Sequence, residues 1–211
     1  MDNKVYLHGI YARSDEYDSR STLNILKHIL KDNALLSSRL QRKSDNQSLF
    51  NGIDYISLCD YEKRKEKFNS NYNSYEGYIR YSLSLAFPKN KVDAIIPQLI
   101  EIEKIGNYYN KMRELGLSTE RRYTDLPDEV QVKDRISLDF MSAITLPISK
   151  MKNPFLNEDK TVYMVLKEIE KVNKLLLKYK HLVPLYDIDT LEKLDESTTK
   201  KLVKYYYKNR G

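Results

Sequence analysis

The stretch from Asp159 to His181 constrains the fold most, because its apolar residues recur at steps of three and four. That spacing is typical of a helix with one apolar face and one charged face. A single helix cannot bury its own apolar face, so the rest of the chain has to supply the surface that covers it. We therefore expect a long C-terminal helix that packs on a sheet. Its apolar positions are Val162, Leu166, Ile169, Val172, Leu176 and Tyr179.

Several shorter segments alternate between apolar and polar residues, as β-strands do. The clearest is 78–87, in which we expect the leucines and Phe87 to face inward and Ser82 and Ser84 to face outward. The segment 143–146 is expected to be the last strand of the sheet. The predicted strands cover residues 5–11, 53–59, 78–87, 126–132 and 143–146.

Helices are expected between and after these strands, so the fold class is α+β. The first helix begins at Ser21 or Thr22 and ends near Asn33, a residue type that tolerates the left-handed conformation. Others are predicted at 97–105, 108–115 and 197–207. No linker or repeat divides the chain, and we expect a single domain, 1–211, with a core at 1–150 and a helical C-terminal extension at 151–211 packed on it.

Composition excludes several classes of protein. With 41% apolar and 31% charged residues, the chain has enough apolar side chains for a core. Its apolar runs are much shorter than the roughly 20 residues of a membrane span, and no secretion signal opens it, so we expect a cytoplasmic protein without a membrane partner. The single cysteine, Cys59, excludes an internal disulfide, and the three scattered histidines give no metal-ligand spacing, so no metal is expected.

Three segments, in order along the chain, carry a recognisable pattern. They are Leu7-His8-Gly9 with the following Asn24-Ile25-Leu26, then Gly52-Ile53-Asp54-Tyr55-Ile56-Ser57, then Glu129-Val130-Gln131-Val132. Together they resemble the catalytic core of the ADP-ribosyltransferase superfamily, especially the diphtheria-toxin-like branch that includes the poly(ADP-ribose) polymerases. The resemblance implies a split mixed or antiparallel sheet with flanking helices. It also implies an enzyme, mono-ADP-ribosyltransferase or toxin-like, that cleaves NAD⁺ and passes ADP-ribose to an acceptor.

The resemblance also assigns roles to individual residues. His8 matches the histidine that holds a ribose hydroxyl of NAD⁺, with Gly9 beside it. Tyr55 matches the tyrosine that lies against the nicotinamide ring, although Asp54 is an insertion and leaves the register open, so Ser57 is a second NAD⁺-binding candidate. Arg39 falls where some branches bind the phosphates of NAD⁺, a role that suits the paired donors of arginine.

Glu129 matches the catalytic glutamate at the start of a short strand. Cleavage of the nicotinamide bond develops positive charge on the ribose, and a fixed carboxylate beside it stabilises the transition state more than the ground state. Toxins of the superfamily that modify arginine carry Glu or Gln two residues before this glutamate, whereas this chain has Pro127. Arginine is therefore disfavoured as the acceptor, and protein, DNA and RNA stay open. An antitoxin or regulatory partner, and secretion as an effector, stay open as well.

The charge of the chain supports one alternative. The formal net charge of +6 attracts anionic ligands, and much of the excess is lysine in the C-terminal helical stretch. The alternative function is a non-enzymatic basic α+β module that binds nucleic acid or a partner protein. Substitution of Glu129 separates the two, because an enzyme loses turnover and a binding module does not.

Overall fold

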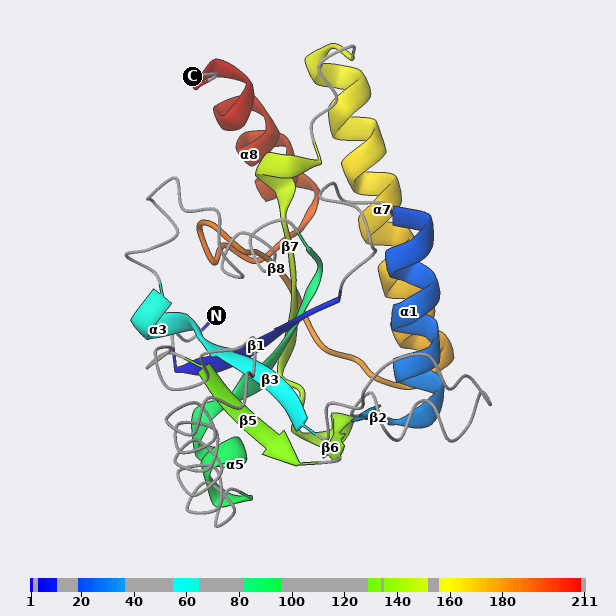
Figure 1. Cartoon of the computed structure of the whole chain (residues 1–211). Coiled ribbons are helices and arrows are strands. Elements are labelled where there is room, and N and C mark those ends of the chain that lie inside the picture. Colours follow the sequence, from blue (N-terminus) through cyan, green and yellow to red (C-terminus); the bar gives the residue numbers. More distant parts are fainter. Residues whose placement is uncertain are drawn as a thin grey trace, which may run out of the picture.

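The computed structural model describes residues 1, 4–10, 19–36, 55–64, 82–95, 129–133, 135–151 and 156–209 (Figure 1). The elements are β1 (Val5–Gly9), α1 (Ser19–Asp32), β2 (Ala34–Leu36), β3 (Tyr55–Asp60), α3 (Tyr61–Arg64), β4 (Ser84–Pro88), α5 (Lys89–Ala94), β5 (Glu129–Lys133), β6 (Arg135–Ser137), η2 (Leu138–Phe140), β7 (Ala143–Leu146), η3 (Ile148–Lys150), α7 (Glu158–Lys178), β8 (Leu185–Asp187) and α8 (Glu196–Lys208).

A mixed six-stranded sheet, in the order β5-β3-β1-β4-β7-β8, forms the centre of the fold. The pair β7–β8 is parallel, and the other neighbouring pairs are antiparallel. A small second sheet joins β2 to β6. Sheet and helices together confirm the predicted α+β class.

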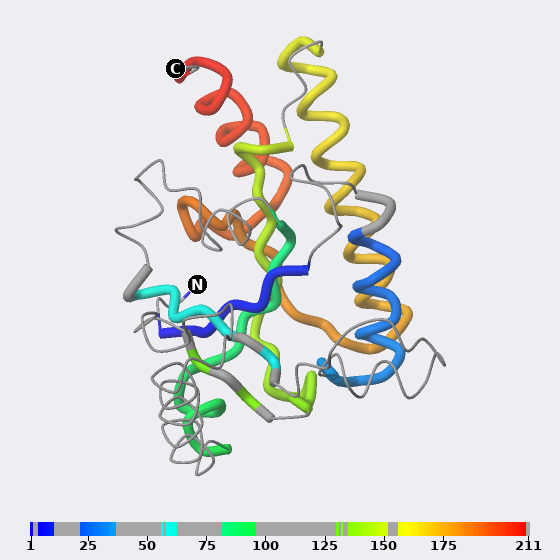
Figure 2. Tube along the Cα trace, in the orientation of Figure 1, coloured from blue at the N-terminus to red at the C-terminus, as the bar shows by residue number. Residues whose placement is uncertain are grey.

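The ladder of the main sheet is weakest between β1 and β3. Within the described residues these strands pair at Tyr6–Asp60 and Leu7–Cys59. On either side the ladders are longer, because β1 pairs with β4 up to Gly9 and β3 pairs with β5 back to Tyr55. In Figure 2, β1 and β3 diverge from the stretch over which they pair. The β1–β3 ladder is thus the shortest in the sheet, which is a single six-stranded sheet.

One face of the sheet packs on α1 and α7, which lie side by side in Figure 1. Alternate strand residues meet the apolar stripes of both helices, and this layer forms the larger core. Leu26 of α1 and Val165, Val172 and Leu176 of α7 are buried in it. The prediction of a long C-terminal helix packed on the sheet is confirmed, with α7 beginning after Asn157, whose side chain accepts a hydrogen bond from the Lys160 amide at 2.9 Å.

The other face of the sheet carries a second, smaller cluster of buried apolar residues. The segment after β8 contributes Ile188 to the cluster. The buried members are Val5, Leu7, Cys59, Tyr61, Ala86, Ala143 and Ile188. Both faces of the central strands are thus covered.

Coverage of both faces corrects the expectation for Ser82 and Ser84. Leu83, Leu85 and Phe87 are buried in the larger core as predicted, but both serines are buried as well. The reason is that the second cluster, which includes Ala86 of β4, covers this face of the sheet, so Ser84 does not meet solvent. Residues 78–81 lie outside the described residues.

The C-terminal region also departs from the expectation of a purely helical extension. β7 is not the last strand, because Leu185–Asp187 forms β8 and pairs in parallel with it. α8 then contributes Leu202 and Val203 to the larger core, so this region is part of the same folded unit. The predicted helices at 97–105 and 108–115 lie outside the described residues. None of the described helices is long and apolar enough to cross a membrane.

Candidate functional site

The three segments singled out in the sequence lie in three neighbouring strands. β1 carries His8 and Gly9, β3 carries Tyr55 and Ser57, and β5 begins at Glu129. These strands are consecutive in the sheet, in the order β5-β3-β1, although they are far apart in the chain. The fold therefore brings these five residues into one half of the sheet. The sixth predicted residue, Arg39, lies outside the described residues.

The strand register gives the main-chain position of Glu129. Its Cα pairs with that of Cys59 in β3, and Cys59 pairs in turn with Leu7 in β1. Ser57 pairs with Gln131, two residues further along β5. For Tyr55, Ser57 and Glu129 the structure describes the main chain alone. Cys59 is fully buried and belongs to the second, smaller cluster.

His8 and Gly9 occupy the end of β1 beyond its pairing with β3. His8 is half-buried and lies on the same face as Tyr6 and Ile10, both of which belong to the larger core. Successive residues of a strand face opposite sides of a sheet, so Gly9 shares its side with Leu7. The row Glu129–Cys59–Leu7 is therefore on the side of Gly9, and His8 is directed toward the helical layer.

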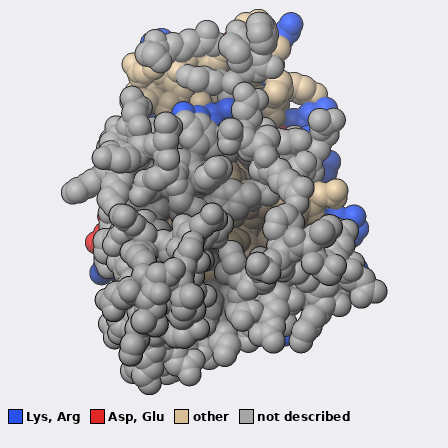
Figure 3. Space-filling view, in the orientation of Figure 1, with Lys and Arg blue, Asp and Glu red and all other residues tan. Residues whose placement is uncertain are grey.

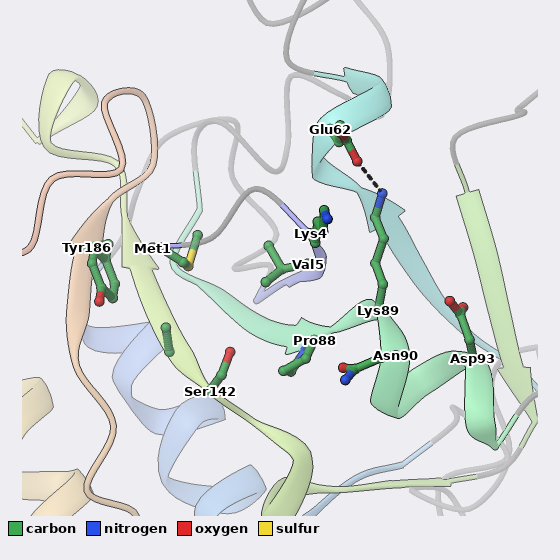
Figure 4. A pocket seen from close by; sticks show the side chains of 11 residues that line it. Met1, Lys4, Val5, Glu62, Pro88, Lys89, Asn90, Asp93, Ser142 and Tyr186 are labelled. Carbon is green, nitrogen blue, oxygen red and sulfur yellow. Dashed lines mark hydrogen bonds and ion pairs between the residues drawn. The ribbon is translucent and has the colours of Figure 1, made fainter.

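A cavity of about 600 Å³ lies at the opposite end of β1 (Figure 4). Pro88, Lys89 and Asp93 line it where β4 passes into α5, and neither His8 nor Gly9 is among its described lining residues. Its lining residues are Met1, Lys4, Val5, Glu62, Pro88, Lys89, Asn90, Asp93, Ser142, Ala143 and Tyr186. The volume is in the range of small-molecule sites, roughly 300–1,000 Å³.

Lys89 is the fixed cation of this cavity. Its ammonium lies 2.6 Å from Asp60 Oδ1 and 3.2 Å from Glu62 Oε2, and 5.8 Å from the centre of the Tyr6 ring. Burial acts to lower the pKa of Lys89, but the hydrogen bonds to Asp60 and Glu62 prevail and raise it above its ordinary value. The charge of Lys89 is thus balanced by two carboxylates, Asp60 and Glu62.

Tyr6 connects the cavity wall to the larger core. Its hydroxyl donates to Asp93 Oδ1 at 3.0 Å. Burial of the ring, followed by this hydrogen bond and the nearby charges of Asp93 and Asp60, raises the pKa of Tyr6 well above its ordinary value. The hydroxyl therefore stays protonated and acts as a donor that fixes α5 to β1.

A second polar cluster surrounds Asp187 at the end of β8. Its Oδ2 accepts hydrogen bonds from the Tyr206 hydroxyl at 2.8 Å and from the Thr190 hydroxyl and amide at 2.9 and 3.0 Å. Its Oδ1 is buried without a partner among the described residues. Burial raises the pKa of Asp187, the hydrogen bond from Tyr206 opposes that rise, and the charge of nearby Asp189 adds to it. The cluster fastens α8 to the sheet.

Sequence reasoning found neither polar cluster. The cavity draws its charged residues from short elements that are distant along the chain, such as α3 and α5, and no spacing rule connects them. The turn after β8 has a local signal in its hydroxyl and carboxylate residues, but the partner Tyr206 comes from α8.

Comparisons with known proteins add no relative. The chain matches no protein-family model, no curated protein and no solved structure. Within the part of the chain that the structure describes, no group of three or more His, Cys, Asp and Glu side chains is arranged to hold a metal ion.

Proposed function

We propose that this chain is an NAD⁺-dependent ADP-ribosyltransferase with Glu129 as its catalytic residue. One observation supports this most: the predicted histidine, tyrosine and glutamate segments, more than a hundred residues apart in total span, occupy the adjacent strands β1, β3 and β5. In a sheet with a different strand order, the three segments would not lie in neighbouring strands. A functional site built from them needs such proximity.

The arrangement of the sheet gives the proposal a second argument. Within the described residues the β1–β3 ladder ends at the Leu7–Cys59 pair, short of His8 and Gly9 on one strand and of Tyr55 and Ser57 on the other. We assign NAD⁺ to this end of β1, and we propose the ADP-ribosyltransferase-like split sheet as the finer description of the fold.

The chemistry assigns each residue a task. The bond between nicotinamide and C1′ of the ribose breaks, and nicotinamide leaves with the electron pair. A nucleophilic atom of the acceptor then bonds to C1′ and loses its proton. The carboxylate of Glu129 stabilises the positive charge that develops on the ribose, while His8, Gly9 and Tyr55 hold the nucleotide in position.

His8 is the residue whose task the geometry restricts. It is half-buried and faces the helical layer, on the side of β1 opposite to Gly9, so it does not share a side with the Glu129–Cys59–Leu7 row. We assign His8 to positioning and not to proton transfer. Substitution of His8 by Ala should therefore raise KM for NAD⁺ more than it lowers kcat, because it removes binding that ground state and transition state share.

The test follows the fate of ADP-ribose. Purified protein is incubated with NAD⁺ labelled on its adenine ring and with a cell lysate, and the label is traced in protein, DNA and RNA fractions. Label that enters one fraction with wild type and not with Glu129→Gln supports the transferase and identifies the acceptor class. If no fraction is labelled and no nicotinamide is released, the proposal fails.

A further inference from the structure

The outward side of α8 carries three lysines around one exposed tyrosine. Lys201, Lys204, Tyr205 and Lys208 are spaced at i, i+3, i+4 and i+7, which places them on one side of the helix. All four are exposed, and 56% of Tyr205 is accessible to solvent. The opposite side of α8 packs into the larger core. We call these four residues the α8 strip.

The lysines of the α8 strip are available to an anion. Lys204 and Lys208 make no ion pair with any described residue. Lys201 lies 3.2 Å from Glu192, but both side chains are exposed, and a pair of this kind contributes little. In Figure 3, Lys and Arg are spread along the upper and right margins of the described surface and at its lower left, and Asp and Glu are visible at the left margin.

Tyr205 is held in place although it is exposed. Its ring packs edge-on against Tyr206, with 5.4 Å between ring centres and 67° between their planes. Tyr206 is in turn fixed by its hydrogen bond to buried Asp187. The strip therefore presents an aromatic ring whose position is set in advance, which lowers the entropy cost of stacking a ligand on it.

We propose that the α8 strip binds single-stranded nucleic acid. The lysines are spaced to neutralise successive phosphates, and Tyr205 offers a face on which an unpaired base stacks. A duplex keeps its bases stacked inside, so the tyrosine favours the single strand. The neighbouring helix α7, which contacts α8 through Thr161 and Tyr207, carries a second exposed aromatic–lysine pair, Tyr163 with Lys167 at 5.7 Å from the ring centre.

This binding is separate from the proposed chemistry. It involves none of the residues assigned to NAD⁺, and it is measured without NAD⁺, so its failure and the failure of the transferase are distinguishable. If both hold, the strip is the surface that holds a nucleic-acid acceptor.

The experiment measures the fluorescence anisotropy of labelled single-stranded oligonucleotides, one DNA and one RNA of about 20 nucleotides, at several salt concentrations. The full chain is compared with Lys204→Gln/Lys208→Gln and with Tyr205→Ala. The matched control is Lys27→Gln/Lys31→Gln, which removes the same charge from the exposed surface of α1. A competing duplex and polyglutamate test the other classes of partner.

We expect the double variant of the strip to reduce the slope of log affinity against log salt by about 1.4, at roughly 0.7 per lost single-strand contact. Tyr205→Ala should weaken binding by roughly 5- to 150-fold with little change in that slope. The α1 control should bind like wild type. Equal loss in the strip and control variants, tighter binding of the duplex, full competition by polyglutamate, or no binding by wild type would each overturn the proposal.

Discussion

Replacement of Tyr206 by Phe removes the hydrogen bond that fastens α8 to the sheet and leaves the ring in place. The Tyr206 hydroxyl donates to Asp187 Oδ2 at 2.8 Å, and Asp187 is buried at the end of β8. A hydrogen bond to an ionised group contributes about 1.5–3 kcal/mol, so we expect the free energy of unfolding to fall by that amount. For a domain of this size the loss corresponds to roughly 3–12 °C in Tm.

The loss should depend on pH. Burial raises the pKa of Asp187 above its ordinary value, so the contribution of this group to stability is fully present below the unfolded pKa and is lost as pH rises through the folded pKa. Tyr206 opposes that loss because it donates to the carboxylate. Its removal raises the pKa of Asp187 further, and the deficit of Tyr206→Phe should be larger at about pH 7.5 than at about pH 4.5.

Urea denaturation of wild type and variant at both pH values measures these differences. Tyr205→Phe is the control, because it makes the same chemical change on the adjacent, exposed ring and should leave the free energy of unfolding unchanged. A second variant, Asp187→Asn, should flatten the pH dependence. Equal deficits for Tyr205→Phe and Tyr206→Phe, or a deficit of Tyr206→Phe that shrinks as pH rises, would refute the reasoning.

Three further predictions concern the core, a helix cap and metal dependence. Leu26→Ala, at a fully buried position of α1, should cost about 2–5 kcal/mol in urea denaturation, whereas Leu177→Ala on the exposed side of α7 should change stability by less than about 0.5 kcal/mol. Asn157→Ala should lower the free energy of unfolding by about 0.5–2 kcal/mol, because the Lys160 amide loses its capping acceptor, and hydrogen exchange should quicken in the first turn of α7. Treatment with EDTA should leave nicotinamide release unchanged, since the proposed cleavage assigns no step to a metal ion.

Much of the helical layer could be predicted because its signals are local. The steps of three and four from Val162 to Leu176 predicted a helix, and α7 spans Glu158–Lys178. Asn33 was expected to end the first helix in a left-handed conformation, and its φ of 51° confirms this. Both signals depend on residues within a few positions of one another.

The elements that the sequence did not reveal depend on distant partners. β8 has three residues, too few to show alternation, and it is a strand because β7 lies beside it. Burial of Ser84 follows from the second cluster that covers its face of the sheet. Strand pairing sets the order β5-β3-β1, and it places Gly9 on the side of the Glu129 row and His8 on the opposite side. The spacing of residues along the chain does not encode this pairing.

The most direct measurement of the central claim is the rate of nicotinamide release from NAD⁺ by wild type, Glu129→Gln and Glu62→Gln. Glu62 is the matched control, since it is an exposed glutamate of α3 outside the assigned site. We predict that wild type and Glu62→Gln release nicotinamide at similar rates. The rate of Glu129→Gln should be lower by a factor of at least about 100, because an amide cannot stabilise the charge that develops on the ribose. Equal rates for all three proteins, or no release by wild type, would contradict the assignment of Glu129.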